Sequence, residues 1–229
     1  MMLNFPLVIV NFKTYSQATG EAAVKLSRIV EEVARKHGVN AAVAVQPFDL
    51  RWVAKTVDIP VLAQHLDPVT PGSHTGWLLP EAAKEAGAAG SLLNHSERSL
   101  PFEQVQAAVK RIRELGMVSV VCAKDVETAA KLATLDPDVV AVEPPELIGS
   151  GVAVSKVKPE VVSNSVRKIK EVNPRVRVLC GAGISSGEDA GLALKLGAEG
   201  VLLASYVVCA KDQRAAVEDI ITGMYFSKG

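Results

Sequence analysis

Apolar runs and amphipathic segments alternate along the whole sequence and predict an α/β protein, a single (β/α)8 barrel over residues 1–229. Three observations support this prediction: eight short apolar runs, helical periodicity between them, and no linker that would separate two domains. The runs do not alternate strictly with polar residues, which is typical of parallel strands buried on both faces. A chain of 229 residues, 48% of them hydrophobic, has the usual length for one such barrel.

The predicted strands are rich in Val, Ile, Leu and Ala, and helices or loops fill the segments between them. In chain order the strands cover residues 7–11, 41–46, 60–64, 90–94, 117–122, 138–142, 176–180 and 200–204. Three helices show a clear apolar stripe at helical spacing, over residues 21–36, 102–115 and 158–172. Glycine follows several predicted helices, as expected where left-handed backbone ends a helix. These glycines are Gly38, Gly87, Gly116 and Gly197.

An open, doubly wound sheet is the alternative arrangement of the same strands and helices. Open sheets that bind dinucleotides carry a GxGxxG motif after the first strand, whereas Asn11-Phe12-Lys13-Thr14 stands there in this chain. Eight consecutive strand–helix units therefore favour the closed barrel. Residues 65–79 form the one long irregular segment, and we expect such a loop to be functional or to contact another subunit.

Composition and charge exclude several classes of protein. The 25 basic and 25 acidic residues cancel, which gives no reason to expect a nucleic acid or an anionic membrane as partner. The three cysteines, Cys122, Cys180 and Cys209, lack metal-binding spacing and indicate a reducing compartment. No signal peptide is recognisable, and no segment approaches the roughly 20 apolar residues of a membrane helix. We therefore expect a cytoplasmic protein.

Titratable side chains stand directly after three of the predicted strands. His95 follows the strand at 90–94, Lys13 follows the first strand, and Glu143 follows the strand at 138–142. The carboxyl ends of barrel strands meet at one rim, where barrel enzymes have their active sites. The sequence therefore predicts an active site built from an imidazole, an ammonium and a carboxylate.

Glu143 precedes Pro144-Pro145, which hold the backbone extended after the strand. Apolar neighbours would raise the pKa of its carboxyl and suit it to act as a general base. The alternative is a solvated charge at the end of a strand. Glu146 is a second candidate for the base, although it lies farther from the strand.

His95 and Lys13 also have ordinary alternatives. A lone histidine is often a packing or capping residue, but a helical turn opening at Ser96 would keep this imidazole neutral, as a hydrogen-bond donor. Lys13 can be an ordinary surface ion pair or a fixed cation beside a substrate anion. We favour the functional interpretation of both, because Glu143 would face them across the barrel.

A phosphate site is predicted after the last two strands, where barrels commonly bind phosphate. Residues 181–188 (GAGISSGE) contain Ser185 and Glu188 at capping-box spacing, so a helix should begin there with free backbone amides. Ala204 and Ser205 are small and allow a ligand close to the backbone. Residues 144–151 end in a Gly-Ser-Gly turn and predict a lid with a glycine hinge over the site; a plain flexible turn is the alternative.

These motifs together resemble the triosephosphate isomerase family along the whole chain. The matching segments are Asn11-Phe12-Lys13, Thr75-Gly76, Asn94-His95-Ser96-Glu97-Arg98, Glu143-Pro144 and Ile148-Gly149-Ser150-Gly151. The resemblance implies a TIM barrel that interconverts D-glyceraldehyde 3-phosphate and dihydroxyacetone phosphate, in glycolysis and gluconeogenesis, with no metal or organic cofactor. The family pairs a glutamate base with a neutral histidine electrophile, which here implies Glu143 and His95.

The same resemblance assigns the remaining site residues. Lys13 would favour the anionic substrate, Asn11 would be its neighbour in the pocket, and Glu97 would support Lys13. Substrate-binding residues would be Ile148, Gly149, Gly183, Ala204 and Ser205, with the amides of the last four forming a phosphate cradle.

Some positions depart from the commoner family pattern. Asn94 replaces a glycine, the lid begins Pro144-Pro145-Glu146-Leu147, and Ala204-Ser205 replaces a glycine pair. With its short length, the chain resembles the compact archaeal members, which form tetramers. We therefore expect a homo-oligomer, with loop 65–79 and its Trp77 at a subunit contact; the alternative is that Trp77 packs on its own barrel.

Two other functions use the same residues. One is a different phosphate-binding barrel enzyme, such as a sugar-phosphate isomerase of amino-acid biosynthesis or a Schiff-base aldolase using Lys13. Such an enzyme would have its active site at the same rim of the barrel. A barrel that only binds a phosphorylated ligand, as a sensor or scaffold, would bind phosphate without proton exchange at carbon.

Overall fold

Eight parallel strands close into one barrel, which confirms the predicted fold class. The structure is a computed structural model that describes residues 3–148, 151 and 153–226. Each strand pairs with its neighbour in sequence and β8 returns to β1, so the sheet has no open edge. The strands are β1 (Leu7–Asn11), β2 (Asn40–Val45), β3 (Val61–Ala63), β4 (Gly90–Leu93), β5 (Val118–Ala123), β6 (Val139–Val142), β7 (Arg177–Cys180) and β8 (Gly200–Leu203).

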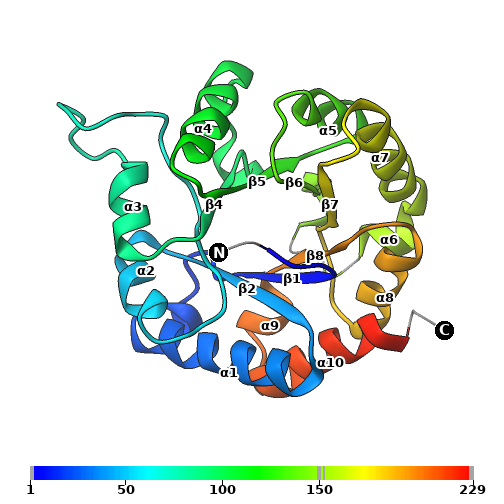
Figure 1. The fold of residues 1–229 in the computed structure, drawn as a ribbon. Coiled ribbons are helices and arrows are strands. Elements are labelled where there is room, and N and C mark those ends of the chain that lie inside the picture. The colour runs from blue at the N-terminus through cyan, green and yellow to red at the C-terminus, as the bar shows by residue number, and fades with distance from the viewer. Residues whose placement is uncertain (1–2, 149–150, 152, 227–229) are drawn as a thin grey trace.

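Helices surround the barrel on its outside, as Figure 1 shows. The longer ones are α1 (Glu21–His37), α2 (Pro47–Ala54), α3 (Pro80–Ala86), α4 (Phe102–Glu114), α5 (Val126–Ala133), α7 (Pro159–Val172), α8 (Gly187–Lys195) and α10 (Gln213–Phe226). Short helical turns are η1 (Ser16–Ala18), η2 (Ser96–Arg98), η3 (Pro145–Leu147), α6 (Val154–Val157) and α9 (Ser205–Val208).

The predicted elements are present, and every strand or helix end that was predicted lies within one residue of its position in the structure. The four glycines expected to end helices all have left-handed backbone. Their φ angles are +65° at Gly38, +105° at Gly87, +66° at Gly116 and +96° at Gly197. Helix periodicity and glycine position therefore located these boundaries correctly.

The core has two layers, which explains why the strand sequences do not alternate between apolar and polar residues. One layer fills the barrel interior with side chains such as Ile9, Leu62, Leu92 and Leu202. The other layer lies between the strands and the helices. Both faces of each strand are therefore buried, as a parallel sheet covered by helices requires.

The segment between β3 and α3 extends away from the barrel, at the upper left of Figure 1. Asp67 anchors its base, because one carboxylate oxygen accepts the Leu78 N–H at 2.6 Å and the other lies 3.0 Å from His65 Nε2. Trp77 is 53% exposed, and the centre of its ring lies 5.8 Å from that of the His74 ring in the same segment.

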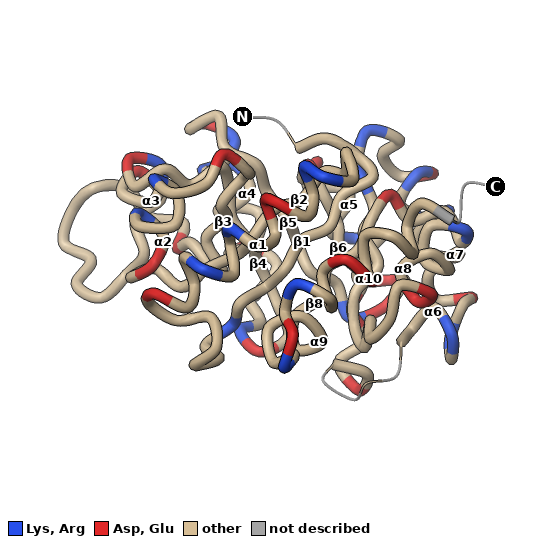
Figure 2. The backbone as a smooth tube through the Cα atoms, turned by 90° about the horizontal axis from the view of Figure 1, so that it is seen from below, with Lys and Arg blue, Asp and Glu red and all other residues tan. Residues whose placement is uncertain are grey.

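Basic and acidic residues are interspersed along the chain, as the tube view in Figure 2 shows. This distribution agrees with the equal numbers of the two charges in the sequence. Among the helices of the described residues, none combines the length and apolar character that crossing a membrane requires.

Helices α8 and α10 approach closely at a glycine, which gives a test of the packing. A Cβ atom at Gly223 would lie 2.0 Å from the carbonyl oxygen of Gly187. Ala is favoured over Gly in an isolated helix by about 1 kcal/mol, but this clash reverses the preference. We expect Gly223→Ala to lower the free energy of unfolding in urea by about 3 kcal/mol.

Thr222→Ala, one position earlier on α10, is the matched control. Among the residues that the structure describes, the Thr222 hydroxyl bonds only carbonyls of its own helix, so the change should stay within about 0.5 kcal/mol of the parent. A Gly223→Ala variant as stable as the Thr222→Ala variant would contradict the close approach of the two helices.

Candidate active site

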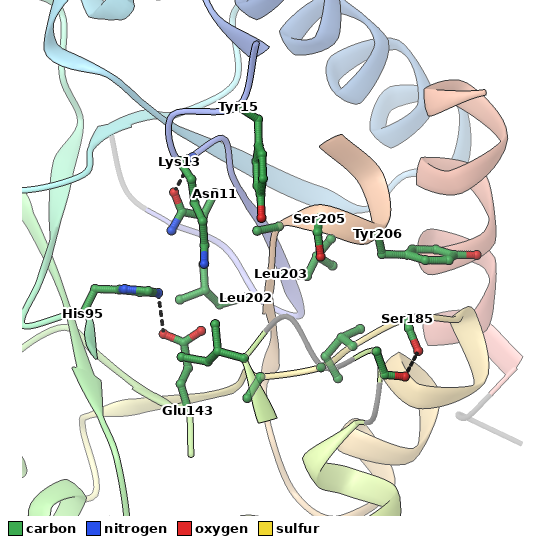
Figure 3. A pocket seen from close by; sticks show the side chains of 16 residues that line it. Asn11, Lys13, Tyr15, His95, Glu143, Ser185, Leu202, Leu203, Ser205 and Tyr206 are labelled. Atoms are coloured by element: carbon green, nitrogen blue, oxygen red, sulfur yellow. Dashed lines mark hydrogen bonds and ion pairs between the residues drawn. The ribbon is translucent and has the colours of Figure 1, made fainter. Parts of the chain in front are cut away.

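A cavity of about 290 Å³ at the carboxyl ends of the strands brings most of the predicted site residues together (Figure 3). The predicted residues that line it are Asn11, Lys13, His95, Glu143, Ile148, Gly183, Ala204 and Ser205. Glu97 joins this group through its ion pair with Lys13. Gly149 lies outside the described residues.

Glu143 is buried at the end of β6 and points into the cavity, so the interpretation as a solvated charge is wrong. Its backbone N–H donates to Ala123 O at 2.8 Å and continues the strand pairing by one residue. Among the described residues, Oε2 has no hydrogen-bond partner. Burial raises the pKa of the carboxyl, and the opposing influence of His95, Cys122 and Lys13 does not cancel it. These are the properties of a general base.

Glycine at position 181 leaves the space that this carboxylate occupies. A Cβ atom there would lie 2.5 Å from Cγ of Glu143 and 2.8 Å from its Oε1. The Gly181 N–H bonds Val142 O, which keeps β7 in register beside β6. Any larger residue would therefore push the carboxylate out of its place.

His95 faces Glu143 with Nε2 at 3.7 Å from Oε2. The turn η2 begins at Ser96 as predicted, and His95 Nδ1 accepts the N–H of Glu97 at 3.2 Å. A nitrogen that accepts carries no proton, so this bond assigns the imidazole proton to Nε2. The ring therefore presents a donor to the cavity.

The backbone and side-chain bonds of Asn94 explain why asparagine can stand where the commoner family pattern has glycine. Its φ of +57° is left-handed, a conformation that asparagine tolerates better than most residues. The side chain donates to Cys122 O at 3.0 Å and accepts the Leu100 N–H at 2.9 Å. Asparagine thus supplies two bonds that glycine lacks, and these hold the segment carrying His95.

Lys13 also has left-handed backbone, with φ of +47°. Asn11 Oδ1 accepts its N–H at 3.0 Å and Gln64 donates to its carbonyl at 2.9 Å. The ammonium lies 2.7 Å from Glu97 Oε1. Lys13 is thus a cation fixed at the cavity wall, and Glu97 is the carboxylate that holds it.

The loop after β7 and the start of α9 bring backbone amides to the same cavity. Ala182 and Gly183 both have left-handed backbone, with φ of +69° and +71°. Among the described residues, the N–H groups of Gly183 and Ser205 donate to no acceptor. Such free amides suit an anionic group of a ligand.

The predicted capping box after β7 is displaced by one residue. Helix α8 begins at Gly187, and its cap is Ser186, whose Oγ accepts the N–H of Asp189. The predicted pair Ser185 and Glu188 does not cap the helix. Ser185 lines the cavity instead.

Glu146 is not part of the cavity lining among the described residues. It is exposed in η3 and pairs with Lys158 at 2.5 Å, and this hydrogen bond lowers the pKa of its carboxyl. Its environment is the opposite of the one that surrounds Glu143.

Three residues near the site were not predicted from the sequence. Tyr15 and Tyr206 line the cavity, and their rings are seen in Figure 3. The Cys122 thiol lies inside the barrel. Burial raises the pKa of this thiol well above its usual value, and the negative charge of Glu143 raises it further. For Cys122 the sequence did offer a signal. Cys122 ends one predicted strand, and the next predicted strand leads into Glu143; in the structure Cys122 pairs with Ala141, two residues before Glu143.

Within the described ranges, no cluster of three or more His, Cys, Asp or Glu side chains could hold a metal ion. The chemistry on the cavity wall is thus a buried carboxylate, an imidazole donor, an ammonium and free amides.

A sequence model of triosephosphate isomerase matches residues 6–224. The chain belongs to the triosephosphate isomerase family. Proteins named triosephosphate isomerase are similar over nearly their whole length. One from Methanothermus fervidus is 58% identical, covering 96% of this chain and 99% of the relative. One from Methanothermobacter thermautotrophicus is 54% identical, covering 95% of this chain and 95% of the relative. One from Archaeoglobus fulgidus is 53% identical, covering 96% of this chain and 99% of the relative.

The buried carboxylate of Glu143 gives a pH-dependent prediction for stability. Burial raises its pKa in the folded state, so its favourable contribution is present below the unfolded pKa and is lost as pH rises through the folded pKa. We expect Glu143→Gln to unfold at a higher urea concentration than the parent at pH 8. The difference should shrink toward pH 4.5.

Glu146→Gln is the control for this measurement. Its carboxyl has a lowered pKa, so the same change should not stabilise the protein at pH 8. A Glu143→Gln variant whose stability follows the parent at every pH would contradict the assignment.

Proposed function

We propose that this chain is a triosephosphate isomerase that interconverts D-glyceraldehyde 3-phosphate and dihydroxyacetone phosphate through an enediol(ate). The observation that carries the proposal is the unpaired Glu143 Oε2, buried and facing the protonated nitrogen of His95. Moving a proton between two carbons next to a carbonyl requires a base at carbon and a donor at oxygen. Membership of the family supports the same reaction, and this chemistry needs no metal or organic cofactor.

In the proposed mechanism, Glu143 removes a proton from the carbon beside the carbonyl and returns it to the former carbonyl carbon. The oxygens exchange a proton as well: His95 Nε2–H gives its proton to the former carbonyl oxygen and takes the proton of the neighbouring hydroxyl, so one oxygen becomes the hydroxyl and the other the new carbonyl. His95 Nε2 donates a hydrogen bond to the oxygen on which negative charge develops. A neutral donor suits this role, because it stabilises the enediolate without first releasing a proton to the Glu143 carboxylate. The contact of 3.7 Å between the two groups leaves them unbonded to each other and available to substrate.

Lys13 supplies the positive charge for substrate and transition state alike. The ion pair with Glu97 fixes its position, and the bond from Asn11 fixes its backbone. We propose that Asn11 borders the substrate beside this lysine, and that Glu97 acts through Lys13 and not on substrate.

The substrate phosphate would be held by backbone amides and not by a side-chain cation. The proposed cradle comprises Gly149, Gly183, Ala204 and Ser205, with Ile148 covering the substrate. Free N–H groups at Gly183 and Ser205 support this assignment. Gly149 remains a proposal from the sequence.

We also propose a homo-oligomer, of four subunits, and a cytoplasmic location. The exposed Trp77 on a loop that extends from the barrel supports a subunit contact there. The sparse, unpaired cysteines support a reducing compartment.

Glu143→Asp tests the base. The change keeps the charge but withdraws the carboxylate by about one carbon–carbon bond, and a shift of roughly 1 Å can cost about 100-fold in rate. We expect kcat to fall by about that factor in a coupled assay with either triose phosphate, run with a chelator present. Binding of a phosphate analogue should be retained.

Glu146→Asp is the matched control and should retain parental kcat. If Glu146→Asp loses kcat while Glu143→Asp keeps the parental kcat, the base is Glu146 and the assignment to Glu143 is wrong. If the parent turns over neither triose phosphate, the proposed function is wrong, and a borohydride-trapped substrate adduct on lysine would indicate an aldolase.

Trp77→Lys tests the assembly. A lysine in place of a large apolar side chain should weaken a subunit contact and lower the mass seen by light scattering on dilution. Activity should fall with the mass if neighbouring subunits support Lys13. A fully active monomeric parent would defeat the proposal.

A further inference from the structure

The chain segment after the predicted lid is attached to the phosphate-side loop by a set of polar contacts. The first segment comprises Gly151 and residues 153–157, with α6; the second is residues 182–189, which lead into α8. The Ser185 hydroxyl lies 3.0 Å from Gly151 O, and the Val154 N–H donates to Ala182 O at 3.3 Å. The buried Ser155 hydroxyl donates to the carbonyl of Asp189 at 3.2 Å.

Asp189 is the centre of this contact. It is 1% exposed, and its Oδ2 accepts the Ser185 N–H at 2.9 Å and lies 3.1 Å from the Ser185 hydroxyl. Its own N–H bonds the capping Ser186. The carboxylate therefore fixes the backbone that leads from the cavity-lining residues into α8.

Lys156 supplies the charge that a buried carboxylate requires. Its Nζ lies 2.9 Å from Asp189 Oδ1, and 3.0 Å from Oε2 of Glu188, which is 80% exposed. Although burial raises the pKa of Asp189, the bonds from Lys156 and Ser185 prevail and lower it. The carboxylate is thus ionised, and it depends on a lysine from the other segment.

The ion pair has two consequences for an anion in the cavity. Gly183 and Ser185 line the cavity, and Ser185 is bonded directly to Asp189, so the pair sets where the loop presents its amides. Lys156 also neutralises a carboxylate that would otherwise repel a phosphate on the same loop.

We propose that Asp189 and Lys156 are positioning residues for the phosphate cradle, joining the lid's C-terminal end to the loop that presents Gly183. This inference rests on the proposed function only for the identity of the phosphate ligand. Neither side chain touches substrate; both act through Ser185 and the loop backbone.

Lys156→Met tests the proposal by leaving the Asp189 charge buried and unpaired. We measure the affinity for inorganic phosphate and for glycerol 3-phosphate by calorimetry, and KM and kcat with glyceraldehyde 3-phosphate. Both affinities should fall about tenfold or more, since misplacement of about 1 Å can cost roughly 100-fold. KM should rise more than kcat falls, and proton exchange of phosphate-free glyceraldehyde should stay unchanged.

Three further variants separate positioning from a general loss of structure. Lys156→Arg keeps the charge and should restore phosphate affinity. Lys156→Met combined with Asp189→Asn removes the unpaired charge while an amide oxygen still accepts the Ser185 N–H, so it should recover part of the loss. Glu188→Gln, which breaks only the exposed contact of the same lysine, should change the affinity less than twofold, in keeping with the small value of surface ion pairs.

Lys170→Met controls for the loss of any partly buried ion pair. Lys170 pairs with Glu199 at 3.0 Å at the amino ends of β7 and β8, on the opposite rim of the barrel. It should leave phosphate affinity at the parental value. Thermal denaturation serves to check that each variant is folded. If Lys156→Met does not fold, the phosphate affinity of the double variant is compared with that of Glu188→Gln, and this comparison tests the inference.

Parental phosphate affinity in folded Lys156→Met, or in the double variant if only that folds, would overturn the inference. Equal losses with glyceraldehyde 3-phosphate and with phosphate-free glyceraldehyde would overturn it as well. Because calorimetry needs no turnover, an inactive parent that still binds phosphate would refute the proposed function and leave this inference to be decided by the binding data.

Discussion

The fold has to keep the carboxylate of Glu143 ionisable although it is buried and, within the described part of the chain, one of its oxygens has no hydrogen-bond partner. Glu143 meets this requirement at the end of β6, with Gly181 leaving the space on one side and His95 facing it on the other. Burial without a partner is costly for a charge, and the raised pKa of the carboxyl expresses that cost.

Backbone strain gathers around the same rim. Lys13, Asn94 and Ala182 have left-handed backbone although none is glycine, and each stands just after a barrel strand. Such conformations persist only where the surroundings fix them. Asn11 fixes Lys13, and the two hydrogen bonds of Asn94 fix its own turn. The turns at Lys13 and Asn94 are thus held by local polar bonds.

The fold and the residues that meet at the cavity were predictable because the information is local. Strands buried on both faces give continuous apolar runs, helices give a stripe, and Glu143, His95 and Lys13 each stand within two residues of the end of a strand. The cap of α8 was misplaced by one residue because the sequence offers two capping pairs at the same spacing, Ser185 with Glu188 and Ser186 with Asp189. Tertiary contacts choose between them: Asp219 accepts the Gly187 N–H, and Lys156 pairs with Asp189. Periodicity carries no information about either contact.

The distribution of charge at the cavity suits the proposed binding of a phosphate ester by amides rather than by a free cation. Among the described residues that line the cavity, Lys13 is the one cation, and Glu97 already pairs with it. Lys156 is likewise taken by Asp189 and Glu188, so no free ammonium faces the phosphate side in the described part of the chain. In the proposed cradle an anion would therefore meet amide dipoles, whose attraction is weaker and more directional than that of a full charge. Uniformly tight binding of substrate and product would not speed the chemical step. In the proposed mechanism, directional amides would hold the phosphate while the interactions of Glu143 and His95 would strengthen only as charge develops.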